Sequence, residues 1–237
     1  MKFNKLSPVA LATTLALGGL AVVPAANAGM SASAAVSNFY LWRGRDVSGG
    51  TPQVSGSLDY KDESGAFVGI WGSSVWGNAS GGGTTDGIET DLYAGYVGAV
   101  GGLSYHVAFW EYLYPEDNAL VGGDYSDSDL SELVLGMSYA GVGMTVFFGN
   151  DAAGGADYEY VTLDYTMGAF KILYGTWMVD STASTPNPDE SSHLTFSYAV
   201  ADNFTLTFTK GMQDTTSSVY DEDILFHLSY SLPIEIK

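Results

Sequence analysis

The chain has 237 residues, with 27 acidic against 8 basic residues, a formal net charge of −19 and no cysteine. A surface of this sign repels a polyanion, so nucleic acid is excluded as a partner, and no disulfide can stabilise the fold. Yet 46% of the residues are hydrophobic and 16 are tyrosines, a composition that suits strands with an apolar outer face better than a soluble acidic domain.

Residues 1–28 have the layout of a secretory signal peptide. Two lysines precede an apolar stretch from Val9 to Val23, and Ala26-Asn27-Ala28 has the A-x-A form of a cleavage site. We expect cleavage after Ala28, which leaves a mature domain of residues 29–237. Beyond the cleavage site, no apolar run is long enough for a transmembrane helix.

Alternation of apolar and polar residues runs through the rest of the chain and predicts β-strands. The segment Phe204-Thr205-Leu206-Thr207-Phe208-Thr209 is the clearest case, because one face is apolar and the other carries only hydroxyl groups. The predicted strands cover residues 31–42, 52–60, 66–76, 88–96, 103–113, 131–139, 144–149, 158–165, 170–178, 193–199, 204–212 and 223–232.

Tyrosines mark one end of every second predicted strand. They lie on the apolar face, and in five of six cases a short turn follows: Tyr60, Tyr96, Tyr139, Tyr165, Tyr198 and Tyr230. The connections at the other end are longer and rich in Gly, Ser, Asp and Asn. This alternation is typical of outer-membrane barrels, which have short periplasmic turns and longer outer loops.

A second set of aromatic residues lies beside the long loops, and it includes Trp42, Trp76 and Trp177. Tyr and Trp favour membrane interfaces, so the two sets predict the aromatic girdles of a membrane barrel. Closure follows, because an open sheet edge in hydrocarbon leaves backbone groups unpaired. We therefore predict an all-β fold, a transmembrane antiparallel up-and-down β-barrel of about 12 strands that follows a cleaved signal peptide and closes as a monomer.

Four segments resemble the TorF family, a group of porin-like outer-membrane barrels. They are Ser37-Asn38-Phe39-Tyr40-Leu41-Trp42-Arg43-Gly44, Gln53-Val54-Ser55-Gly56-Ser57-Leu58-Asp59-Tyr60, Gly69-Ile70-Trp71-Gly72-Ser73-Ser74-Val75 and Glu89-Thr90-Asp91-Leu92-Tyr93-Ala94-Gly95-Tyr96. The rest of the chain agrees in hairpin layout more than in motif. The resemblance implies a porin-like channel in the outer membrane of a Gram-negative bacterium. The chain departs from such barrels at its end, where it continues beyond Tyr230 to Lys237 instead of finishing on an aromatic residue.

Charged residues on the polar face are candidates for lining a pore. They are Asp59, Glu89, Asp91, Asp164 and Lys171, together with Arg43 and Arg45 at the top of the first predicted strand. An acidic lumen would favour cations. The alternative is that some of these acids bond only across the barrel wall. The two arginines predict either a constriction opposite an acid such as Glu89 or Glu132, or a salt bridge that fixes the first loop, or an arginine that snorkels at the interface.

Two kinds of chemical site are not expected. The densest acidic run, Asp124, Asp127, Asp129 and Glu132, lacks the spacing of an EF-hand loop and predicts a solvated acidic rim, with no metal or cofactor. Such a rim would meet lipopolysaccharide through bridging divalent ions. All three histidines fall on the polar face and no G-x-S-x-G motif occurs, so a lipid hydrolase with its dyad on the outer wall, or any other enzyme, is not expected.

The sequence therefore favours an outer-membrane porin-like channel for passive diffusion of small solutes, with a weak preference for cations. Its expected partners are outer-membrane lipid, lipopolysaccharide, the barrel-assembly machinery and the solutes themselves. Two alternatives remain. One is a non-conducting surface-exposed structural or adhesion barrel that displays acidic loops, and the other is a soluble exported β-sandwich that acts as a binding module.

Overall fold

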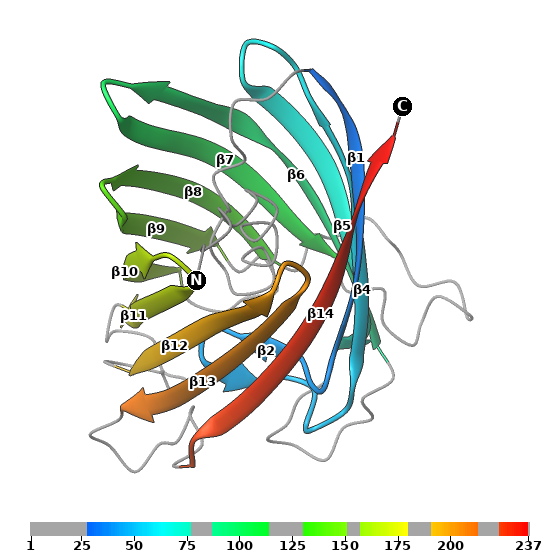
Figure 1. Ribbon diagram of the computed structural model, residues 1–237, viewed down its shortest axis with the longest axis vertical. Helices are drawn as coiled ribbons and strands as arrows, with labels where there is room; N and C mark the ends of the chain where they lie inside the picture. The colour runs from blue at the N-terminus through cyan, green and yellow to red at the C-terminus, as the bar shows by residue number, and fades with distance from the viewer. Residues whose placement is uncertain are drawn as a thin grey trace, which may run out of the picture.

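Antiparallel strands close into one 12-stranded barrel in the computed structural model (Figure 1). The structure describes residues 28–76, 87–113, 130–150, 157–179, 191–212 and 223–236, so the predicted signal peptide lies almost wholly outside it. The wall consists of β1 (Gly29–Ser37), β4 (Gln53–Lys61), β5 (Ala66–Trp76), β6 (Gly87–Val100), β7 (Leu103–Leu113), β8 (Leu130–Tyr139), β9 (Val142–Asn150), β10 (Tyr158–Met167), β11 (Phe170–Val179), β12 (Ser192–Ala201), β13 (Phe204–Met212) and β14 (Leu225–Ile236). Two short strands, β2 (Leu41–Trp42) and β3 (Arg45–Asp46), form a separate hairpin.

Each wall strand pairs with the next wall strand along the chain, and β1 closes the ring against β14. The closing register runs from Met30 opposite Ile236 to Ser37 opposite Ser229. The predicted up-and-down barrel is confirmed, and a β-sandwich is wrong because one continuous sheet forms the whole wall. The described ranges contain no helix that is long and apolar enough to cross a membrane.

The strand that was predicted to end at Tyr96 continues to Val100. Only Gly101 and Gly102 connect it to β7, with φ angles of 58° and 84°. Positive φ at both central residues is the geometry of a tight hairpin turn, and glycine adopts it without steric cost. The prediction placed the turn too early because Gly98, inside the strand, resembles a turn residue.

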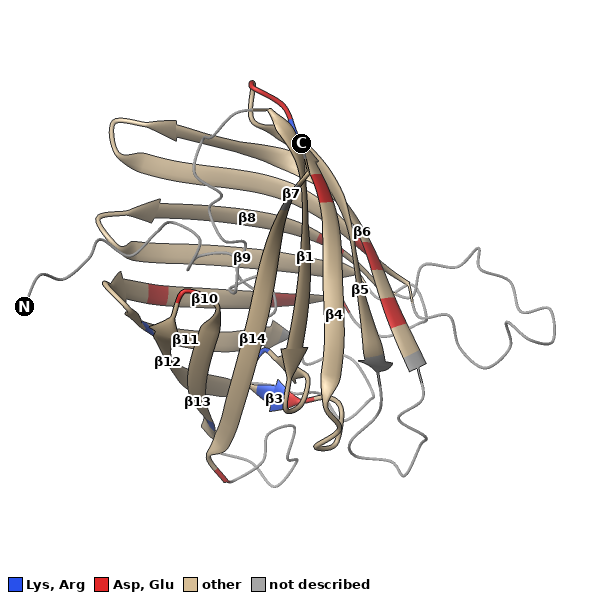
Figure 2. Cartoon of the chain, turned by 45° about the vertical axis from the view of Figure 1, so that its right-hand side comes forward, with Lys and Arg blue, Asp and Glu red and all other residues tan. Residues whose placement is uncertain are grey.

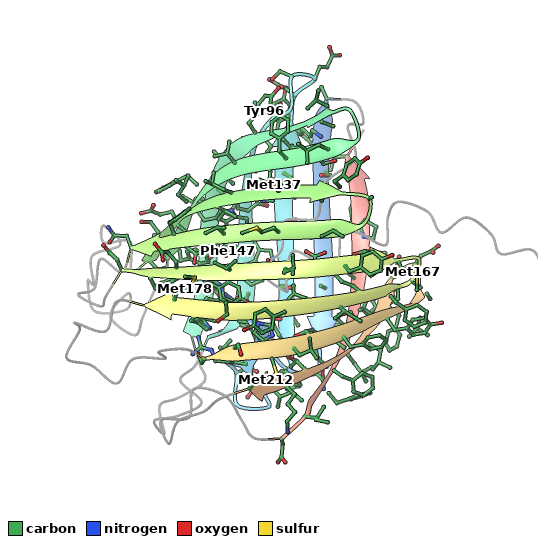
Figure 3. All side chains as sticks on the ribbon, turned by 90° about the vertical axis from the view of Figure 1, so that its left-hand side faces the viewer. Tyr96, Met137, Phe147, Met167, Met178 and Met212 are labelled. Carbon is green, nitrogen blue, oxygen red and sulfur yellow. The ribbon has the colours of Figure 1, made fainter. Side chains whose placement is uncertain are left out.

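The apolar face of the wall points outward. Among the tyrosines at the turn end, Tyr60, Tyr96, Tyr139, Tyr165 and Tyr230 are exposed, and Tyr198 is half-buried. Figure 3 views the outer face of the strands from β8 to β13, where the labelled Met137, Met167 and Met178 are among the exposed apolar side chains. A continuous apolar wall of this kind is stable in lipid and not in water. The predicted orientation of the tyrosine face is confirmed.

The inner face is polar and bonds to itself along the wall. Hydroxyl pairs connect neighbouring strands, with Oγ1 of Thr195 2.7 Å from Oγ1 of Thr209 and Oγ of Ser33 2.8 Å from Oγ of Ser57. These bonds satisfy side chains that face the lumen, so the inner wall tolerates polar groups without help from solvent.

The two faces predict opposite outcomes for one substitution at adjacent positions near the middle of β4. Leu58→Arg places a charge in lipid and should lower the free energy of unfolding by about 2–4 kcal/mol. Ser57→Arg, whose side chain faces the lumen, is the matched control and should change it by less. Urea titration of the refolded protein in lipid vesicles measures both. Equal destabilisation by the two variants would contradict the outward orientation of Leu58.

The prediction of a second aromatic girdle is wrong for Trp177 and Trp42, which lie inside the barrel. Trp177 is buried inside the barrel, where its ring centroid lies 5.5 Å from that of Trp42. The prediction used their position beside the long loops and neglected their phase. Trp177 follows Leu173 and Gly175 on the inner face of β11, and Met178 is the outward residue. Trp76 ends β5, and its side chain lies outside the described residues.

Candidate functional site

The chain leaves the barrel wall at Asn38, so the first strand ends at Ser37 and the predicted strand 31–42 is too long. The Asn38 side chain takes the place of a pairing strand. Its Nδ2 donates to the carbonyl of Phe226 at 2.9 Å, and its Oδ1 accepts from the N–H of Leu228 at 2.8 Å. These bonds satisfy the backbone of β14 while the main chain turns inward. The wall resumes at Gln53, which pairs directly with Ser37.

Residues 38–52 fold back into the barrel and carry the β2–β3 hairpin, which Figure 1 shows within the ring of strands. Leu41 pairs with Asp46 and Trp42 pairs with Arg45, which leaves Arg43 and Gly44 as a two-residue turn. Their φ angles of 47° and 81° are those of a type I′ turn. A positive φ is unfavourable for arginine and persists only where the surroundings hold the residue in place.

The base of this hairpin is held by its own hydrogen bonds. The Asp46 carboxylate accepts from the N–H of Ser48 at 2.9 Å and from the N–H of Gly50 at 2.6 Å. Ser48 Oγ accepts from the N–H of Tyr40 at 2.9 Å. These bonds satisfy backbone N–H groups at the base of the hairpin, as a buried loop requires.

The hairpin crosses the lumen from one wall to the opposite wall. Near its start, the ring of Phe39 packs edge-on against His227 of β14, with centroids 5.1 Å apart. At its tip, Gly44 lies so close to His193 of β12 that a Cβ would be 2.4 Å from the imidazole Cγ. Arg43 reaches β8 to β11, which are centred opposite β1 in the ring. The hairpin thus blocks much of the cross-section at the loop end.

Arg43 ends in a pocket of the far wall and is 2% exposed. Its Nη2 lies 2.5 Å from Oε1 of Glu132, and its Nη1 lies 3.4 Å from the hydroxyl of Tyr158. The guanidinium carbon also lies between 4.5 and 5.7 Å from the centroids of the rings of Trp42, Phe147, Tyr158, Tyr160 and Trp177. Contacts of this kind attract a cation to the ring face. We name the wall residues of this pocket, Glu132, Phe147, Tyr158, Tyr160 and Trp177, the aromatic cage.

The aromatic cage is fixed by contacts that do not involve the hairpin. Glu132 Oε2 accepts from the hydroxyl of Tyr112 at 2.7 Å, and Oε1 accepts from Tyr158 at 2.6 Å. The hydroxyl of Tyr160 lies 2.6 Å from Nε2 of His193. The carboxylate and the rings are therefore preorganised around the position of the cation.

All seven residues predicted to line a pore lie inside the barrel, and Figure 2 shows the acidic strips on β4 and β6. Asp59 accepts hydrogen bonds from Tyr93 and from Ser57, and Asp164 forms an ion pair with Lys171 at 3.6 Å. Asp59 and Asp164 therefore bond to other residues of the barrel wall, which is the alternative to lining a pore.

Glu89 and Asp91 follow one another on the inner face of β6 and are buried, at 1% and 4% exposure. The Arg45 guanidinium carbon lies 4.9 Å from the Trp42 centroid and 5.4 Å from the Trp177 centroid, two rings that Arg43 also contacts. Of the two acids proposed as partners of the arginines, the ion pair forms with Glu132. Charges of both signs thus meet at the level of the hairpin.

The lumen is packed at the loop end and more open toward the turns. Near the hairpin, Glu132, Val134 and Tyr160 are at most 1% exposed. Toward the turns, small inward residues such as Ser229 are half-exposed. Side chains are therefore packed most closely at the level of the hairpin and the aromatic cage.

Sequence reasoning missed the aromatic cage except for Trp177, which it assigned to the outer girdle. A signal was present, because Tyr158 and Tyr160 follow one another on the polar face at the loop end of their strand. Large aromatic rings on an inward face need a partner inside the barrel. That partner is the hairpin.

The three histidines of the chain, His106, His193 and His227, all face the lumen and are buried. A hydrolytic dyad on the lipid-facing wall would need one of them outside. The outer wall therefore has no histidine to serve as a general base.

Comparison with solved structures finds other barrels at low similarity. The KdgM porin is 10% identical with a TM-score of 0.48, and the match covers 87% of this chain and 99% of that chain. Outer membrane phospholipase A from Escherichia coli is 10% identical with a TM-score of 0.43, covering 89% and 90%. At this level, neither similarity assigns a function.

No curated protein matches the sequence. The resemblance to the TorF family is not tested by these comparisons and stays a prediction. Residues 21–176 match the profile of a family described as bacterial protein of unknown function (Gcw_chp). The chain belongs to this Gcw_chp family.

Proposed function

We propose that this protein is a channel of the bacterial outer membrane that lets small solutes diffuse through a lumen narrowed by the hairpin of residues 38–52. The observation that carries the proposal is the contrast between the two faces of a closed wall. The outer face is apolar and suits lipid, whereas the inner face carries hydroxyl, carboxylate and imidazole groups together with several aromatic rings. Burying polar groups costs free energy, so a barrel that only served as a structural element would be more stable with an apolar interior. The polar interior therefore favours a passage for solutes.

We propose a weak preference for cations, because acids dominate one side of the lumen. Glu89 and Asp91 lie on β6, whereas Lys171 on β11 is neutralised by Asp164. Carboxylates along a narrow passage raise the local concentration of cations. The ion pair of Arg43 with Glu132 cancels its own charge and adds no preference.

A second candidate function is a non-conducting barrel that presents its loops at the cell surface. The close packing around Arg43 and Tyr160 favours it, because no solute passes where side chains are fully buried. The two functions differ in one measurement. A channel conducts in planar bilayers, whereas the structural barrel gives no channel events even when its heat-dependent migration in gels proves that it has folded.

The cation preference predicts the effect of neutralising the β6 acids. In planar bilayers under a salt gradient, we expect the wild-type reversal potential to have the sign of cation selectivity. The double variant Glu89→Gln/Asp91→Asn should move it toward zero, because two lumen charges are lost. Asp202→Asn, in the exposed turn between β12 and β13, removes a charge outside the lumen and should leave it unchanged. An unchanged potential in the double variant would contradict this assignment.

A further inference from the structure

The aromatic cage combines a carboxylate with several ring faces, and in this structure it holds a guanidinium group of the same chain. We infer that the aromatic cage is the solute-recognition site of the channel and that it takes solutes bearing a guanidinium group. Arg43 then acts as an internal ligand that occupies the site and keeps the hairpin in the lumen. This inference rests on the proposed channel function and names the class of solute.

The chemistry of the cage favours guanidinium over ammonium. A guanidinium is planar, weakly hydrated and able to stack on aromatic rings, whereas an ammonium is compact and strongly hydrated. Four of the ring centroids lie at 4.5 to 5.0 Å from Cζ of Arg43, and the fifth lies at 5.7 Å. Glu132 binds one edge of the group while the rings enclose its faces. The cation is 2% exposed as a result.

The cage belongs to the wall and its occupant to the hairpin, so the occupant can be exchanged. Glu132 and four of the five rings belong to β8 to β11, and only Trp42 and the cation itself come from the hairpin. Tyr112 and His193, which hold Glu132 and Tyr160 in place, also belong to the wall. A solute with the same head group can therefore replace Arg43 without rebuilding the wall.

Arg43 is attached to the wall through a short segment, so it competes at a high effective concentration. Tethered ligands of this kind act at about millimolar effective concentration or above. We expect external guanidinium solutes to displace it only in or above that range, and to widen the passage when they do. The strained backbone of Arg43, with φ at 47°, favours its release.

The test compares two matched solutes and two proteins. L-argininamide and L-lysinamide carry the same charge and differ in the head group. With wild-type protein in planar bilayers, argininamide should raise the conductance at millimolar concentration or above, and lysinamide should not. In Arg43→Ala, argininamide should cause no such rise, because there is no internal ligand to displace.

A binding measurement keeps the test independent of conduction. Guanidinium chloride at low millimolar concentration should raise the midpoint of thermal unfolding of Arg43→Ala, and methylammonium chloride should not. Arg43→Ala/Glu132→Gln should lose this rise. If no protein conducts while guanidinium still stabilises Arg43→Ala, the channel function fails and the cage assignment stands. Equal responses to the two head groups, or no stabilisation by guanidinium, would overturn the assignment.

Discussion

Replacing residues 38–52 by a two-residue Asn-Gly turn should raise the single-channel conductance by about threefold or more, because a 12-stranded barrel has room for a water-filled passage once the segment that crosses it is gone. The design leaves the wall intact. Ser37 and Gln53 are direct cross-strand partners, so a type I′ turn can join them without a change in register. The measurement is conductance in planar bilayers, with heat-dependent gel migration as the check of folding.

A matched control changes the same segment without entering the lumen. Gly49→Asn lies in the part of the loop where a Cβ would meet nothing within 4 Å, and asparagine tolerates its φ of 60°. Its conductance should equal that of the wild type. A folded excision variant whose conductance equals that of the wild type would show that the hairpin is not the constriction.

We expect the excision to have a large effect on conductance because the hairpin supplies much of the packing at the loop end. Its side chains Tyr40 and Leu41 are at most 4% exposed although they belong to a connection and not to the wall. In a barrel without this segment, Trp177 and its neighbours would face water across the lumen. The passage is therefore limited by a few residues of one loop, whereas the strands only define its outer boundary.

The strands of the wall were predictable because the same alternation of apolar and polar residues recurs along the chain. Every strand alternates between lipid and lumen, so the phase set by one tyrosine such as Tyr139 is confirmed by Met137 and Leu135 before it. Turns were predictable where glycine follows the tyrosine closely. The predicted strands agree with the observed ones except at a few ends, of which the first strand matters most.

The hairpin was not predictable from the same signals. Phe39, Tyr40, Leu41 and Trp42 continue the apolar run of the first strand, and nothing in their periodicity marks the departure from the wall. The departure depends on the Asn38 amide, which bonds two groups of a strand 188 residues further along the chain. The turn residue Arg43 is also unusual, because Asn or Gly is the common choice there. These are long-range contacts that no local pattern contains.

The site was partly predictable. Glu132 was one of two acids predicted to face the arginines, because an arginine in a chain rich in acids is expected to pair with one of them. The structure shows the ion pair of Arg43 with Glu132. The rings around it were missed, because inward and outward aromatic residues are equally compatible with the end of a strand. Only the phase distinguishes them, and Trp177 shows that position alone misleads.

Glu132→Gln should release the hairpin, because it leaves the guanidinium of Arg43 buried without its carboxylate. Removing one partner of a buried ion pair costs about 3–5 kcal/mol. The pair is 1% and 0% exposed, so solvent does not screen this cost. A single cysteine reports the release, since the chain has none of its own. Leu41→Cys, at a position 2% exposed, should react with a maleimide several hundredfold faster or more in the Glu132→Gln background, because each 1.36 kcal/mol corresponds to about a tenfold change.

Two further variants separate the hairpin from the wall. Arg43→Met/Glu132→Gln removes the uncompensated charge and places an apolar side chain among the rings, so labelling of Cys at position 41 should return toward the slow rate. Asp164→Asn breaks the partly exposed pair with Lys171, which is worth at most about 1 kcal/mol, and should leave labelling slow. Slow labelling in Glu132→Gln would show that the ion pair does not hold the hairpin. Fast labelling together with loss of heat-dependent migration would show that it stabilises the whole barrel instead, and the hairpin would then not be a separately releasable element.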